Sequence, residues 1–303
     1  MRRFNTIKIK ALLSFCYVFL LISCVETETP SFNESSLYIF GDSLSDVGNA
    51  NIAAAGLVPD VNYYQGRFSD GLLYADILAA ELNTPMKPSR EYGSNYAFAG
   101  MKSKAISAQV FNYQENVDGQ ADATAVFIVW GGANDLLGLV QEENTAEDID
   151  EAVDHIKNAI VNLSSIGAIN IIVPNQVNLA RLPRTIQSET QIPGITAAAE
   201  SLSIQFNTAL NNMLIALSTE DDISTIPIDT FSLFEDIIAN PNNYDFDNVT
   251  EPCYVKDEFS IKLTGDETIC DNPARYLFWD SIHPSTATHV ILSQQILVKI
   301  NEI

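Results

Sequence analysis

The chain alternates short apolar runs with longer segments whose apolar residues are spaced as in a helix. Mostly apolar runs predict buried strands at residues 37–40, 125–130, 169–173 and 223–228. Pro227 lies inside the fourth run, which places that strand near a sheet edge. Helices are expected at residues 72–82, 146–166, 195–217 and 284–301.

Strands that are apolar throughout, with helices between them, predict an α/β fold with a mostly parallel sheet covered on both faces. No linker or internal repeat follows residue 36, so we expect a single domain over residues 37–303. Ligands of such sheets bind at the carboxyl ends of the strands. Three polar or irregular segments would share that edge: Ser43, Gly131–Asp135 and Pro174–Asn178.

Ser43 could be a catalytic nucleophile, or it could only cap a helix that follows the first strand. A nucleophilic serine needs a base and a group that orients this base. Of the three histidines, His155 and His289 lie in predicted helices, whereas His283 precedes a proline and is expected in a loop. Asp280 is near enough in sequence to reach one nitrogen of His283, which leaves the other nitrogen for Ser43. This spacing alone is a weak signal, because a helix cap and a surface histidine explain it equally well.

Five blocks, in order, resemble those of the SGNH or GDSL hydrolase superfamily, specifically its GDSL lipase/acylhydrolase branch. They are "FGDSLSDVGN", "GRFSDG", "NYAFAG", "GGANDL" and "FWDSIHPS". The resemblance covers nearly all of the chain beyond residue 36. It implies the SGNH hydrolase fold, a three-layer sandwich with a flavodoxin-like sheet.

The resemblance also implies site residues. Ser43 would be the nucleophile, His283 the base and Asp280 the carboxylate that orients it. The oxyanion would be held by the backbone amides of Ser43 and Gly100 and by the side-chain amide of Asn134. Gly100 has no side chain, so its amide can approach a substrate closely. Such a site requires no metal and no cofactor.

Several polar neighbours are expected to hold the structure rather than touch substrate: Asp42, Asp46, Asn49 and Asp135. Ser69 or Asp70 suits the N-cap of the helix predicted at residues 72–82.

These roles predict a serine hydrolase that cleaves carboxylic esters of lipids or small acyl groups. An acyltransferase would use the same acyl-enzyme and pass the acyl group to an alcohol. A non-catalytic binding protein on the same fold would predict damaged triad or oxyanion positions, and all five are present.

The N-terminal residues resemble the signal peptide of a bacterial lipoprotein. A basic start is followed by an apolar stretch over residues 11–22, too short for a good membrane span, and then by Ser23-Cys24. We expect a signal peptide at residues 1–23, lipid on Cys24 and a flexible tether at residues 24–36. The protein would then be exported and anchored on the periplasmic face or cell surface; the alternative is a secreted protein in which Cys24 is incidental.

The net charge and the cysteines exclude some classes of partner and predict a disulfide. The formal net charge is −23, and it becomes −27 once the four basic residues of the signal are removed. Such a surface repels nucleic acid, and no required protein partner is evident.

In an exported chain, Cys253 and Cys270 predict a disulfide, with two free buried thiols as the alternative. No metal site is expected, because there is no CxxC and the histidines do not cluster with the cysteines.

Overall fold

The computed structural model of the chain describes residues 36–141, 146–256 and 263–303. The expected signal peptide, Cys24 and all but the last residue of the expected tether lie outside the described residues. The described residues fall in one structural unit. Of the helices within the described ranges, none combines the length and apolar character needed to cross a membrane.

Four parallel strands form the central sheet. In lateral order they are β1 (Leu37–Gly41), β2 (Val126–Trp130), β3 (Asn170–Pro174) and β4 (Thr225–Ile228). β1 and β2 are buried along their whole length, which explains why their residues are apolar on both faces. All four predicted strands are confirmed, with ends that differ by at most two residues.

A short extended segment, residues 94–98, lies along the free edge of β1. Its backbone exchanges three hydrogen bonds with β1: Ile39 N to Ser94 O (3.1 Å), Tyr96 N to Ile39 O (2.7 Å) and Phe98 N to Gly41 O (3.0 Å). A parallel bridge pairs Ile39 with Asn95. The lateral order is thus segment 94–98, β1, β2, β3 and β4, which is the flavodoxin-like order. Segment 94–98 therefore leads the chain toward the carboxyl end of the sheet, where β1 ends.

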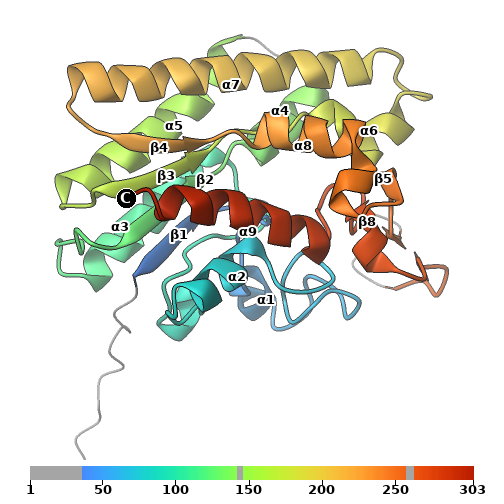
Figure 1. The fold of residues 1–303 in the computed structure, drawn as a ribbon, viewed down its shortest axis with the longest axis horizontal. Coiled ribbons are helices and arrows are strands. Elements are labelled where there is room, and N and C mark those ends of the chain that lie inside the picture. The colour runs from blue at the N-terminus through green and yellow to red at the C-terminus, as the bar shows by residue number, and fades with distance from the viewer. Residues whose placement is uncertain (1–35, 142–145, 257–262) are drawn as a thin grey trace, which may run out of the picture. The chain divides into compact units, whose positions relative to one another are not determined.

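Two groups of helices cover the sheet (Figure 1). One group is α3 (Ile106–Asn116), α5 (Ala146–Ser165) and α7 (Ile195–Glu220); the other is α2 (Tyr74–Glu81) and α9 (Thr286–Ile300). Phe127 of β2 packs against Tyr113 of α3, whereas Trp130, three residues further on, packs against Tyr74 of α2. Because residues three apart on a strand face opposite sides, the two groups cover opposite faces. The expected three-layer sandwich is confirmed.

The remaining α-helices lie mostly near the carboxyl ends of the strands: α1 (Asn49–Ala53), α4 (Ala133–Gln141), α6 (Pro183–Ser188) and α8 (Thr230–Ala239).

Two small strand pairs accompany the sheet. β5 (Asn248–Pro252) pairs in parallel with β8 (Tyr276–Phe278), and β6 (Tyr254–Val255) pairs antiparallel with β7 (Thr268–Ile269). A disulfide joins Cys253 and Cys270, whose Cα atoms are 4.9 Å apart, so this prediction is confirmed. Behind the disulfide lies a second, smaller core, the aromatic cluster, formed by Tyr63, Cys253, Tyr254 and Trp279.

The predicted N-cap at Ser69 or Asp70 is wrong. α2 begins two residues later than predicted, and the Asp76 carboxylate accepts the Leu73 amide at its start (3.1 Å). Asp70 instead accepts the amide of Thr286 (2.7 Å), and the Ser69 hydroxyl donates to the carbonyl of Pro284 (2.9 Å). These two residues therefore tie the loop before α2 to the start of α9.

Candidate active site

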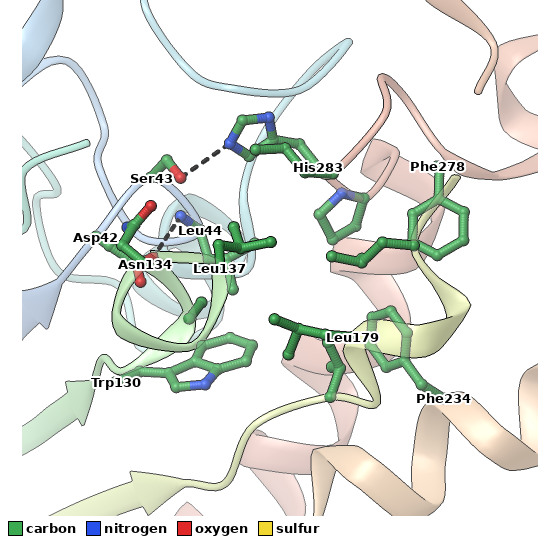
Figure 2. Close-up of a pocket in the computed structure, with 15 residues that line it drawn as sticks. Asp42, Ser43, Leu44, Trp130, Asn134, Leu137, Leu179, Phe234, Phe278 and His283 are labelled. Carbon is green, nitrogen blue, oxygen red and sulfur yellow. Dashed lines mark hydrogen bonds between the residues drawn. The ribbon is translucent and has the colours of Figure 1, made fainter. Parts of the chain in front are cut away.

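Ser43, His283 and Asp280 form one continuous chain of hydrogen bonds. Ser43 Oγ lies 2.8 Å from His283 Nε2, and His283 Nδ1 lies 2.7 Å from Asp280 Oδ2. Figure 2 shows Ser43 and His283 facing each other across this contact. His283 is in the loop between β8 and α9, as expected, whereas His289 is fully buried in α9. The structure thus brings together the three residues that the sequence singled out.

The turn that presents Ser43 is fixed by the end of β1. A Cβ on Gly41 would lie 2.2 Å from the carbonyl oxygen of Trp130, so no side chain fits there. The Gln109 side chain bonds both the amide and the carbonyl of Gly41, each at 2.8 Å. One residue later, the Asp42 carboxylate accepts the Leu44 amide (3.1 Å) and braces the turn, as expected. Ser43 is therefore held with its hydroxyl toward His283.

Asp46 and Asn49 hold the loop that carries Gly100 close to Ser43. The Asp46 carboxylate accepts four backbone amides, at 2.6–3.0 Å: those of Gly48, Asn49, Ala50 and Ala99. The Asn49 side chain donates to the carbonyls of Asn95 (2.8 Å) and Ala97 (2.9 Å). Gly100 has a φ of +75°, in the left-handed region that favours glycine. No neighbouring atom lies within 4 Å of where its Cβ would stand, so its surroundings are open.

Asn134 stands at the start of α4 and contacts the loop that carries Gly100. Its Nδ2 donates to the carbonyl of Met101 (3.0 Å). The Asp135 carboxylate accepts the amide (2.7 Å) and the hydroxyl (2.9 Å) of Ser103. Asp135 was expected to support Asn134, and it does so by tying α4 to the loop after Gly100. Ser43, Gly100, Asn134 and His283 all line one groove.

Two buried carboxylates at the site, Asp280 and Asp42, have pKa values that are shifted in opposite directions. Burial raises the pKa of Asp280, but His283, the Tyr63 hydroxyl and the Ile282 amide outweigh it and hold this pKa below its ordinary range. Asp280 is therefore ionised at neutral pH and can stabilise a protonated His283. Burial dominates at Asp42, whose pKa rises to about 6 although the Leu44 amide and His283 oppose the rise.

Tyr63 is a site residue that the sequence reasoning missed. Its hydroxyl donates to Asp280 Oδ2 at 2.5 Å, from the loop between α1 and α2. The one signal in the sequence was a pair of tyrosines just before "GRFSDG", which had no helical or strand period to explain it. From the same loop, the ring of Phe68 lies 5.1 Å from the ring of His283, measured between centroids.

Two apolar hollows meet at Ser43. The first, which we call the inner cavity, has a volume of about 40 Å³ and is lined by Leu44, Trp130, Leu137, Leu179, Phe234 and Phe278 (Figure 2). The second, the outer groove, is wider and more open, and is lined by Ala53, Val58, Phe68, Phe98 and Gly100. A third, more polar pocket lies beside Asp280, between Tyr63, Arg184 and Lys256. Ser43 thus has separate apolar space on two sides.

No group of three or more histidine, cysteine, aspartate or glutamate side chains within the described residues is arranged to hold a metal ion.

Residues 37–296 match the family model described as GDSL-like Lipase/Acylhydrolase. A GDSL esterase/lipase of Arabidopsis thaliana is 26% identical, over 86% of this chain and 86% of the relative. The thermolabile hemolysin of Vibrio parahaemolyticus is 23% identical, over 87% of this chain and 63% of the hemolysin. Among solved structures, an acetylxylan esterase of Geobacillus stearothermophilus is 17% identical with a TM-score of 0.49, over 88% of this chain and 94% of the esterase.

Proposed function

The chain belongs to the GDSL-like lipase/acylhydrolase family and is a hydrolase of ester bonds, and we propose that it cleaves carboxylic esters through an acyl-enzyme on Ser43. The observation that carries the proposal is the hydrogen-bonded chain from Ser43 through His283 to Asp280. In this chain Ser43 loses a proton, His283 takes it, and Asp280 orients His283 for that transfer.

His283 Nε2 takes the proton of Ser43 as Oγ attacks the carbonyl carbon of the ester. The protonated His283 then gives that proton to the alcohol oxygen as the C–O bond breaks. Water attacks the acyl-enzyme by the same route and releases the acid. Asp280 stays ionised throughout, holds the Nδ1–H of His283 and stabilises the imidazolium.

The backbone amides of Ser43 and Gly100 and the side chain of Asn134 hold the oxyanion. The Asn134 amide nitrogen carries two hydrogens. One is used by the carbonyl of Met101, which fixes the side chain, and the other remains for the oxyanion. A prepositioned donor of this kind costs no reorganisation at the moment of reaction.

The inner cavity and the outer groove suit different parts of the ester, the acyl chain and the alcohol. The inner cavity is small and apolar, so it suits a short acyl chain. The outer groove is wider and open, so it suits an alcohol whose far end extends into solvent. We therefore propose esters of short fatty acids as substrates, with few limits on the size of the alcohol.

A lipid anchor on Cys24 belongs to the proposal as well, on the support of the sequence alone. Metabolic labelling with a fatty acid is expected to mark wild type and to fail with Cys24→Ala. Equal labelling of both proteins would remove the anchor from the proposal and leave the esterase untouched.

The test of the mechanism is turnover of p-nitrophenyl butyrate, combined with covalent labelling by a fluorophosphonate probe. Ser43→Ala should lose turnover by more than about 10³-fold and should lose labelling. Ser165→Ala, an exposed serine at the end of α5, is the matched control and should retain both. Ester turnover near that of wild type in Ser43→Ala would refute the mechanism. A competing alcohol separates hydrolysis from acyl transfer, since the free acid is the product expected here.

A further inference from the structure

We propose that Tyr63 is a positioning residue of this site: its hydroxyl holds the Asp280 carboxylate in the orientation that directs His283. The inference rests on the proposed function, because it concerns how the same triad is kept in place. It goes beyond that function in assigning a role to a residue outside the five blocks of the sequence.

The two carboxylate oxygens of Asp280 have different hydrogen-bond partners. Oδ1 accepts the backbone amides of Ile282 (2.8 Å) and His283 (2.7 Å), which belong to the same short loop. Oδ2 faces His283 Nδ1 (2.7 Å) and also accepts the Tyr63 hydroxyl (2.5 Å). Among the hydrogen bonds found within the described residues, Tyr63 is the partner of Asp280 that comes from outside loop 280–283. It therefore ties this loop to the rest of the domain at the oxygen that His283 uses.

The Tyr63 ring is held on several sides, so its hydroxyl has a fixed direction. Its centroid lies 5.6–6.2 Å from three other rings, at steep interplanar angles: Phe68, Tyr254 and Trp279. The Lys256 ammonium lies 4.7 Å from the ring centroid and also bonds the Asp60 carboxylate (3.0 Å). The disulfide joins this cluster through Cys253, the neighbour of Tyr254. A ring this constrained loses little further freedom when its hydroxyl bonds Asp280.

The hydroxyl also changes the chemistry of the pair. A hydrogen bond to a carboxylate favours its ionised form and shares its negative charge. The Tyr63 hydroxyl therefore helps to keep Asp280 ionised beside His283. Burial raises the pKa of Tyr63 far above neutral, so the phenol keeps its proton and always donates.

Tyr63→Phe separates this role from mere packing, because it removes the hydroxyl and keeps the ring. Tyr254→Phe is the matched control: it removes a phenol from the same aromatic cluster, where the hydroxyl contacts Asn62 (3.0 Å) and Asp60 (3.2 Å) rather than Asp280. The measurements are kcat and KM for p-nitrophenyl butyrate, determined separately for wild type and both variants.

We expect Tyr63→Phe to lower kcat/KM by about tenfold, the loss typical of one hydrogen bond to a charged group. We also expect this loss to lie in kcat rather than in KM, because Tyr63 contacts Asp280 and lines neither the inner cavity nor the outer groove. Tyr254→Phe should keep both constants near those of wild type. A loss confined to KM in Tyr63→Phe, or equal losses in both variants, would overturn the proposal.

A double-mutant cycle tests whether Tyr63 acts through Asp280. The rate of fluorophosphonate labelling is the readout, because it can be followed even in a slow enzyme. Tyr63→Phe should slow labelling in wild type and have little further effect in Asp280→Asn; equal effects in both backgrounds would overturn the proposal. Labelling at the wild-type rate in Asp280→Asn itself would instead refute the proposed triad.

Discussion

The size of the inner cavity leads to a specific expectation for the acyl chain. Each methylene moved from water into an apolar site contributes about 0.8 kcal/mol, which is roughly fourfold in kcat/KM. The cavity holds about 40 Å³, and a site for one water needs about 10–15 Å³ by the same measure. It therefore has room for about three or four chain atoms.

The assay is kcat/KM for p-nitrophenyl esters from acetate to dodecanoate. We expect a rise of roughly fourfold per methylene from acetate to butyrate. Beyond that length the chain meets Trp130, Phe234 and Phe278 at the wall of the cavity, and kcat/KM should fall.

Two substitutions test which of the two hollows holds the acyl chain. Leu179→Ala enlarges the inner cavity and should move the optimum to longer chains, at a stability cost of about 2–5 kcal/mol that a melting curve would record. Phe98→Ala, in the outer groove, is the control and should leave the chain-length optimum in place. A steady rise of kcat/KM to dodecanoate in wild type that Phe98→Ala abolishes and Leu179→Ala leaves unchanged would show that the acyl chain lies in the outer groove.

Three further predictions concern the oxyanion site, the disulfide and a buried acid. Asn134→Ala should lower kcat by about 10²–10³-fold with little change in KM; a raised KM at unchanged kcat would contradict its role. Replacing Cys253 and Cys270, 17 residues apart, by serine should lower the free energy of unfolding by about 3 kcal/mol in urea titrations, and an unchanged midpoint would contradict this. Asp42 has a folded pKa raised from 3.8 to about 6, so it binds more protons in the native state and costs stability as pH rises. The free energy of unfolding of wild type should thus fall relative to Asp42→Asn between about pH 4 and pH 6 and stay level above it; a constant difference would argue against a buried ionisable Asp42.

Most of the fold could be predicted because the inner strands of the sheet are buried on both faces. A strand such as β2 must then be apolar at every position, which gives a signal that needs no knowledge of its neighbours. The edge segment 94–98 was not predicted as a strand, because its sequence "SNYAF" is not an apolar run and its pairing with β1 is a single bridge. β5 was missed for the same reason, since it contains polar residues and is half exposed. β8 is apolar, but it has only three residues, too few to show a strand pattern.

At the site, elimination among three histidines was enough to single out His283, because a proline after it excluded a helix. Tyr63 could not be found this way. Its partner Asp280 is 217 residues away in the chain, and no local pattern encodes a contact at that distance. Ser69 and Asp70 were assigned to the nearest helix start, whereas their partners are at the start of α9, which only the folded chain brings near.

The distance along the chain between Ser43 and His283, 240 residues, has a consequence for when activity can begin. At about 5–20 residues per second, a ribosome needs roughly 12–48 s to pass from one to the other. With both residues in their proposed roles, the growing polypeptide carries a nucleophile without a base throughout that interval. Ester cleavage then starts only when α9 docks, through Asp70 and Ser69, onto a nearly finished domain. The onset of turnover during refolding should therefore report this last docking step rather than the formation of the sheet.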